Sequence, residues 1–162
     1  MSAGRSRWFA GAVGAVCVFA ACSTPKPGGP GAAAASEVAP EERRDQRVTL
    51  EDLHILVRAD EILATPAVWN RHDTRECNPT DTTWSVFCAL QKASLEVLGE
   101  YRHRAVALQE VRFAVEEATR GIELQHRLMD YNNMPSTRFE DVKALLRVAT
   151  ERVRARLAAQ LR

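Results

Sequence analysis

Residues 69–112 read WNRHDTRECNPTDTTWSVFCALQKASLEVLGEYRHRAVALQEVR and hold two of the three tryptophans and two of the four cysteines of the chain. Apolar side chains cover most of the circumference of residues 81–98, where only Ser85, Lys92 and Glu96 form a narrow polar stripe. A helix of this kind is normally buried among other helices. The stretch therefore predicts a central helix over residues 81–98.

Three further helices are expected around this one. Apolar residues recur at three- and four-residue spacing over residues 49–64, over residues 105–119 and from residue 137 to near the C-terminus. Thr49 and Thr137 each stand three residues before an acidic residue, which is typical of a capping box at a helix start. No long stretch alternates between apolar and polar residues, so the sequence predicts a small four-helix, all-α domain.

Two segments have no helical pattern. Residues 67–80 are polar and irregular, with a turn signal at Asn78-Pro79, and a loop of this length without its own structure is often functional. Residues 122–134 have no clean period, and either a short helical turn or an extended passage is expected there.

The N-terminus is expected to be a targeting segment. Arg5 and Arg7 precede an uncharged, mainly apolar run that is short for a membrane span, so residues 1–21 are interpreted as a signal peptide. The run ends in small residues before Cys22 and resembles the lipobox of bacterial lipoproteins, whose cysteine carries the lipid. The alternatives are an ordinary secretory signal and a buried helix. The resemblance, with serine after Cys22, implies an outer-membrane anchor facing the periplasm.

Residues 22–47 are expected to be a flexible linker after the lipidated cysteine, because this stretch is rich in proline, glycine and alanine. Residues 48–162 then form a single helical domain. This part has 16 Lys and Arg against 17 Asp and Glu, so it has no overall positive charge that would attract nucleic acid. The expected partners are the membrane, through the lipid, and a protein or another component of the envelope.

Cys77 and Cys88 remain once the targeting cysteines are set aside. Two cysteines eleven residues apart in an exported domain most often form a disulfide. A redox-active pair is the alternative, but the two cysteines lack the short spacing that tunes a thiolate. None of the four histidines is paired at the usual zinc spacing, so no metal site and no cofactor are expected.

The joint Glu100-Tyr101-Arg102-His103-Arg104 is dense in polar groups. Together with charged residues of the next helix it predicts either an internal ion-pair network bracing the second helix against the third, or one wall of a polar cleft. The other walls would come from the loop at residue 69 and the segment at residue 130. The candidate binding residues are Trp69, Asn70, Arg71, Asp73, Glu100, Tyr101, Arg102, His103, Glu110, Arg112, Asp130, Asn132 and Asn133.

Three short segments resemble a family of small bacterial proteins of unknown function. They are Phe87-Cys88-Ala89-Leu90, the run LMDYNNMP at residues 128–135, and Asp141-Val142 followed by Leu145-Leu146. Asn133 stands where that family usually has Asp, and Thr137 lies one position before its usual capping Thr. The resemblance over residues 84–149 supports a helical fold and implies that Asn132 holds the turn before the last helix.

The leading functional hypothesis is a lipid-anchored envelope protein that binds a partner and has no catalytic activity. One alternative is a cell-wall or glycan hydrolase that uses Glu100, Glu110 and Asp130, with Arg102 and His103 as helpers. Another is an immunity-type inhibitor that covers a toxin's active site with residues 69–80. No nucleotide-binding, serine-hydrolase or zinc-protease motif is present.

Overall fold

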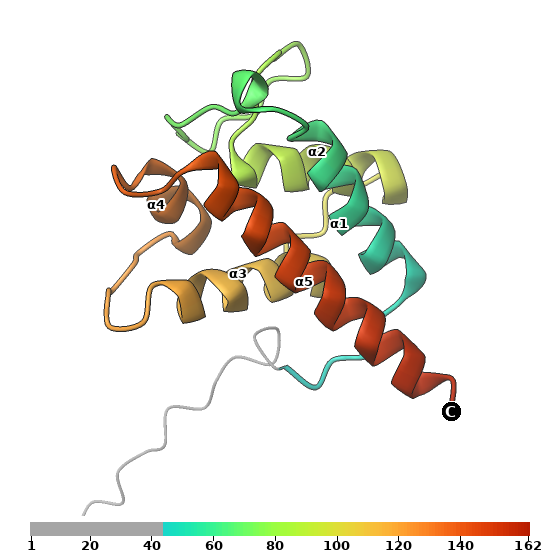
Figure 1. Cartoon of the computed structure of the whole chain (residues 1–162). Helices are drawn as coiled ribbons and strands as arrows, with labels where there is room; N and C mark the ends of the chain where they lie inside the picture. Colours follow the sequence, from blue (N-terminus) through green and yellow to red (C-terminus); the bar gives the residue numbers. More distant parts are fainter. Residues whose placement is uncertain (1–43) are drawn as a thin grey trace, which may run out of the picture. The chain divides into compact units, whose positions relative to one another are not determined.

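The computed structural model describes residues 44–162, and this part of the chain is all-helical. It contains five α-helices rather than the expected four (Figure 1). The elements are α1 (Leu50–Ile62), the 3-10 helix η2 (Pro66–Val68), α2 (Val86–Leu98), α3 (Val106–Ala118), α4 (Arg127–Asn133) and α5 (Phe139–Gln160). Within residues 44–162 the only β-type pairing outside the helices is an isolated bridge between Trp69 and Trp84.

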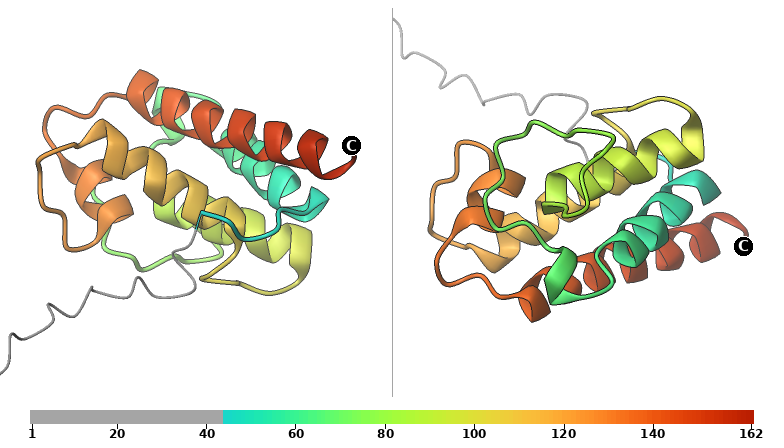
Figure 2. Two further views of the ribbon diagram at one scale, coloured as in Figure 1. Left: turned by 90° about the horizontal axis from the view of Figure 1, so that it is seen from below. Right: turned by 90° about the horizontal axis from the view of Figure 1, so that it is seen from above.

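Helix α1 packs against three of its neighbours. It contacts α2, α5 and α3, and Figure 2 shows it between α2 and α5 when the molecule is seen from above. α3 also packs against α5 and α4, and it buries nine of its thirteen residues where α2 buries six of thirteen. The central place expected for α2 is therefore shared, because α1 contacts three other helices and α3 buries more of its residues than α2 does. Fully buried core residues include Ile55, Leu56, Leu90, Leu108, Val111, Val142, Leu146 and Val153.

The start of α2 lies five residues later than the apolar pattern predicts. The Ser85 hydroxyl accepts a hydrogen bond from the backbone N–H of Cys88 at 3.1 Å, so Ser85 is the N-cap. Leu95, expected to be buried, is 45% exposed. The helix ends at Gly99, whose φ of +75° lies in the left-handed region that favours glycine.

The expected capping box at the start of α1 is confirmed. The Asp52 carboxylate accepts from the backbone N–H of Thr49 at 2.9 Å, and the Thr49 hydroxyl lies 3.4 Å from the N–H of Asp52. The second carboxylate oxygen of Asp52 accepts from the N–H of Ala107 in the first turn of α3, at 3.0 Å. Ala105, the N-cap of α3, has no side chain that could cap the helix. The buried Asp52 carboxylate thus accepts backbone hydrogen bonds at the starts of both α1 and α3.

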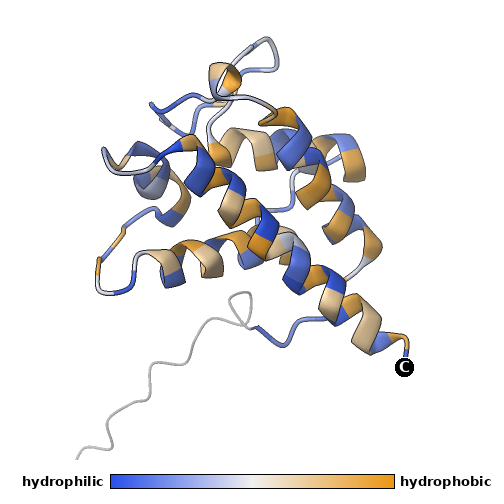
Figure 3. Ribbon diagram, viewed as in Figure 1, coloured by the Kyte–Doolittle hydropathy of each residue, from blue (hydrophilic) through white to orange (hydrophobic). Residues whose placement is uncertain are grey.

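The expected capping box at Thr137 is wrong. The Thr137 hydroxyl donates to the carbonyl of Tyr131 at 2.7 Å, so it closes the turn after α4 instead of starting α5. Arg138 is the N-cap, and its N–H donates to the Asp141 carboxylate at 2.9 Å. In Figure 3 hydrophilic and hydrophobic stretches alternate along the ribbon of α5, as expected of an amphipathic helix on a core.

Residues 122–134, for which the sequence left two conformations open, contain the seven-residue helix α4. The Asp130 carboxylate accepts from the backbone N–H of His126 at 2.8 Å and so stabilises the start of this helix. Two turns are too few to show a helical period in the sequence.

The predicted signal peptide, lipidated Cys22 and most of the predicted linker lie outside the described residues. Among residues 44–162 no helix combines the length and the apolar character that crossing a membrane requires.

Candidate functional site

The loop between the two tryptophans is closed at its base. The N–H of Asn70 donates to the carbonyl of Trp84 at 3.0 Å, and the N–H of Trp84 donates to the carbonyl of Val68 at 2.7 Å. The expected disulfide is confirmed, since Cys77 and Cys88 are bonded with their Cα atoms 5.3 Å apart. Residues 69–84 therefore form a compact loop whose ends meet and whose far side is tied to α2.

Asn132 joins this loop to α4 and α2. It is fully buried, and its Oδ1 accepts from the indole Nε1–H of Trp69 at 2.9 Å and from the N–H of Val86 at 3.1 Å. Its Nδ2 donates to the carbonyl of Asn70 at 2.9 Å. The role expected for Asn132 is therefore wrong in its location: the side chain does bond to backbone, but this backbone belongs to the loop and to α2 rather than to the turn before α5.

Neighbouring residues add to the same connection. The Asn133 side chain accepts from the N–H of Asp73 at 2.8 Å and donates to its carbonyl at 2.9 Å. Arg71 donates to three carbonyls of the turn between α4 and α5, including that of Thr137 at 3.1 Å. We call Trp69, Arg71, Asp73, Asn132 and Asn133 the loop clasp. Its polar groups are largely engaged in holding the loop, and whether any of them also binds a partner stays a prediction.

Trp69 shows how the clasp is built. It is half-buried, and its ring lies 6.1 Å from the ring of Phe139 at the start of α5, measured between centroids. The Arg71 guanidinium lies 5.3 Å from the Trp69 ring. These contacts, with the indole hydrogen bond, give Trp69 a structural role in joining the loop to the last two helices.

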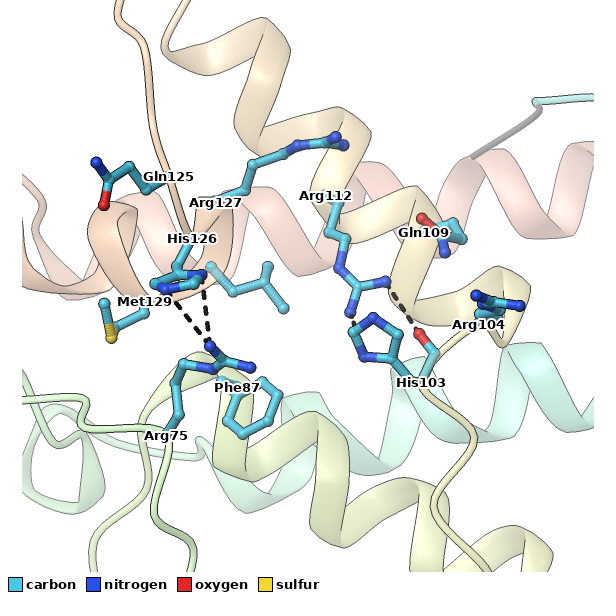
Figure 4. A pocket seen from close by; sticks show the side chains of 11 residues that line it. Arg75, Phe87, His103, Arg104, Gln109, Arg112, Gln125, His126, Arg127 and Met129 are labelled. Carbon is cyan, nitrogen blue, oxygen red and sulfur yellow. Dashed lines mark hydrogen bonds between the residues drawn. The ribbon is translucent and has the colours of Figure 1, made fainter. Parts of the chain in front are cut away.

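A cavity of about 340 Å³ lies where the loop, α2, α3 and α4 meet (Figure 4). This basic cavity is lined by Arg75, Phe87, His103, Arg104, Gln109, Arg112, Gln125, His126, Arg127, Leu128 and Met129. Four of these residues are arginines and two are histidines, and none of the described lining residues carries a carboxylate. Positive charges gathered in a recess attract an anion.

Two arginine–histidine contacts frame the cavity. Figure 4 shows Arg75 with His126 on one side and Arg112 with His103 on the other. Arg75 Nη1 lies 3.4 Å from Nδ1 of His126, and Arg112 donates to the carbonyl of His103 at 3.0 Å and lies 3.2 Å from its ring. Arg127 lies 3.9 Å from the Glu116 carboxylate, which is not among the lining residues.

Aromatic rings lie beside these cations. Phe87 of α2 and Tyr101 pack edge to face at 6.2 Å, and the Arg75 guanidinium lies 5.8 Å from the Phe87 ring centroid. Burial raises the pKa of the Tyr101 hydroxyl, and the nearby Arg112 and Arg75 charges offset part of this rise. Tyr101 therefore stays a neutral hydroxyl at neutral pH, 3.3 Å from Nδ1 of His103.

The predicted acids do not share a site. Glu100 pairs with Arg102 at 2.6 Å on the surface, and Asp130 caps the start of α4. Glu110 is buried and pairs with Arg156. Glu110 was expected in an ion-pair network between the second and third helices. In the structure it pairs with Arg156 and so links α3 to α5 instead.

Of the predicted residues, His103 and Arg112 line the basic cavity. Sequence reasoning missed Arg75, His126 and Arg127 as members of the same site. A signal was present in the two short basic runs, residues 102–104 and 125–127, each of which combines histidine with arginine and lacks an acid. In residues 44–162 no group of three or more His, Cys, Asp or Glu side chains is placed to hold a metal ion.

Fold and site together define, over residues 44–162, an all-helical fold in which a disulfide-tied loop and a short helix border a basic cavity. The chain belongs to a family of unknown function, DUF6197, whose model matches residues 47–152. The match covers the loop clasp and the basic cavity and extends beyond residues 84–149, where the resemblance was expected. No curated protein and no solved structure matches the chain.

Proposed function

We propose that the protein is a lipid-anchored envelope protein that binds an acidic component of the envelope in the basic cavity and catalyses no reaction. The observation that carries the binding function is the lining of this cavity, with four arginines, two histidines and no described carboxylate. The volume of about 340 Å³ lies near the low end of the range typical of small-molecule sites. A small anionic group fits such a recess, and partial exclusion of water strengthens its attraction to the arginines.

The anchoring part of the proposal rests on residues 1–22. Their basic start, apolar run and small residues before Cys22 resemble a lipoprotein signal, and lipid on Cys22 would hold the protein at the outer membrane. Lipid on Cys22 would keep the binding domain close to the other components of the envelope.

The placement of the acids supports binding over hydrolysis. A glycoside hydrolase of the common kind places two carboxyl groups roughly 5–9 Å apart on either side of one bond. Glu100, Glu110 and Asp130 each have a different structural partner, and none of them lines the basic cavity.

The test is a pulldown from detergent-solubilised envelope of the native bacterium with the tagged full chain. Arg75→Glu reverses a charge in the cavity, and Arg154→Glu reverses an exposed charge of α5 outside it. We expect the captured component to be lost with Arg75→Glu and retained with Arg154→Glu, with unchanged helicity in both. Retention of the component by Arg75→Glu would contradict binding at this cavity, and conversion of the component by the wild type would contradict the non-catalytic role.

A further inference from the structure

The basic cavity has features that select among acidic ligands, and we propose that it binds a phosphate monoester. This inference rests on the proposed binding function and names the chemistry of its ligand. A phosphate monoester carries about −1.5 to −2 charges at pH 7 and offers three strong acceptor oxygens. Arginine binds phosphate through short, charge-assisted hydrogen bonds.

The arrangement of the arginines favours a phosphoryl group over a carboxylate. Arg75 comes from the loop, Arg112 from α3 and Arg127 from α4, so three elements contribute an arginine to the lining of the cavity. Figure 4 shows Arg75 and Arg112 on opposite sides of it. A planar carboxylate is satisfied by the fork of a single arginine, whereas a tetrahedral phosphoryl group accepts hydrogen bonds from several directions. Several separated arginines therefore match the phosphoryl group better.

Apolar residues of the lining favour an ester over inorganic phosphate. Phe87, Leu128 and Met129 share the cavity with the cations. Sites that bind small molecules combine apolar walls with a few placed polar groups. The apolar part of the lining would contact the organic group of the ester while the arginines hold its phosphate.

The backbone at Arg75 supports a functional role for this side chain. Its φ of +64° makes it the only non-glycine residue with positive φ in the described part of the chain. Glycine, asparagine or aspartate adopts this conformation more easily than arginine. The Asp73 carboxylate accepts from the N–H of Arg75 at 2.7 Å, and the disulfide at Cys77 lies two residues further on. The loop thus holds Arg75 toward the cavity before any ligand arrives, which lowers the entropy lost on binding.

Isothermal titration calorimetry with the full chain in detergent tests the proposal. The soluble probe is glycerol 3-phosphate, and the lipid probe is a detergent micelle doped with phosphatidic acid, which is also a phosphate monoester. Succinate and micelles doped with phosphatidylcholine are the controls for charge and for the diester. We expect saturable one-to-one binding of at least one monoester probe, and binding at least tenfold weaker for succinate and phosphatidylcholine.

Three variants locate the binding. Arg75→Gly removes the guanidinium at a φ that favours glycine, so it should abolish binding while the melting temperature stays within a few degrees of the wild type. Arg112→Gln should weaken binding at least tenfold, and Arg154→Gln, outside the cavity, should leave it unchanged.

The results of these titrations either support or overturn the proposed phosphate site. If the wild type binds glycerol 3-phosphate and the cavity variants do not, the ligand is a free ester. If the wild type binds phosphatidic acid but not glycerol 3-phosphate, and the cavity variants bind neither, the ligand is a lipid headgroup. Equal binding of succinate, equal loss with Arg154→Gln, or no binding of either monoester overturns the proposal. If neither monoester binds while Arg75→Glu still loses envelope capture, the phosphate inference fails and the proposed binding function stands.

Discussion

The buried side-chain amide of Asn132 connects α4 to the loop and to α2. Its side chain bonds to Trp69, to Val86 and to the carbonyl of Asn70. Replacing it by alanine leaves the buried N–H of Val86, and the partly buried indole of Trp69 and carbonyl of Asn70, without this partner, and each buried unsatisfied group costs about 1–3 kcal/mol. We expect Asn132→Ala to lower the free energy of unfolding by about 3 kcal/mol, measured by urea denaturation.

Asn78 provides the matched control for that change. It is exposed in the same loop, and its side chain bonds only to Thr80 in a local turn. Asn78→Ala should cost less than about 1 kcal/mol, as most surface substitutions do. Equal losses for the two variants would show that the Asn132 amide does not hold the loop.

At the level of elements, the disulfide connects the loop to the first turn of α2. Closing a loop of eleven residues stabilises a fold by roughly 2–3 kcal/mol in the chain-entropy description. Reduction should therefore lower the melting temperature by about 10 °C in a unit of this size. Differential scanning calorimetry with and without reductant measures the shift.

The Cys77→Ala, Cys88→Ala double variant should melt at the temperature of the reduced wild type and show no response to reductant. Two free thiols in protein purified from the envelope, measured by mass spectrometry, would mean that the bond does not form in the cell.

One ion pair on the surface links α1 to α2. Glu96 lies 2.5 Å from Arg58 of α1 and 2.8 Å from Lys92, and these partners lower the pKa of the Glu96 carboxyl below its ordinary value of 4.5. A lowered pKa means that the stabilisation is present above the ordinary pKa and is lost as the pH falls through the lowered one. Because both partners are about a third exposed or more, the contribution is about 0.5 kcal/mol.

We therefore expect Glu96→Gln to reduce the free energy of unfolding slightly at pH 7, with the difference from the wild type disappearing at an acid pH below the lowered pKa of the Glu96 carboxyl. Paired urea denaturation at the two pH values measures it. Glu123→Gln is the control, because Glu123 has no ion pair within residues 44–162. A difference that persists at low pH would show that the effect of Glu96 is not electrostatic.

The sequence predicted an element correctly where the contacts that fix its start lie within a few residues of one another. The start of α1 was predicted because Thr49 and Asp52 cap each other within one turn. The predicted start of α5 was wrong because the Thr137 hydroxyl donates to the carbonyl of Tyr131, a contact that exists only once α4 has folded. The extra helix was not resolved because seven residues are too short to show a period.

The same limit applies to the site. His103 and Arg112 were predicted because they lie close together in an unusually polar stretch. Arg75 and His126 are 51 residues apart, and only the docking of α4 against the loop brings them together. Trp69 and Asn132 were both named as candidate binding residues, but spacing alone did not show that they bond to each other.

At the scale of the whole molecule, the attachment to the membrane is predicted from Cys22, which lies outside the described residues. Cys22→Ala should abolish recovery of the protein with the membrane fraction, because the acyl chains supply the attachment. The helical part should remain folded, since the described core is built from residues of 48–153. Fractionation followed by immunoblotting measures the first effect, and circular dichroism measures the second.

The outcome that contradicts lipid anchoring is full membrane association of Cys22→Ala with a cleaved N-terminus. Retention of the uncleaved signal is distinguishable by the mass of the protein. The family match begins at residue 47 and does not include the predicted anchor at Cys22, so this test is independent of the family assignment.

The shared carboxylate of Asp52 makes the formation of two helices interdependent. Thr49 and Ala107 are bound to the same side chain although they are 58 residues apart, and α3 has no capping side chain of its own. The first turn of α3 therefore gains its cap only when α1 has docked, and fraying of one helix start releases the other. In hydrogen exchange, the amide of Ala107 should open together with the start of α1, so the two helices behave as one cooperative unit rather than as separate segments.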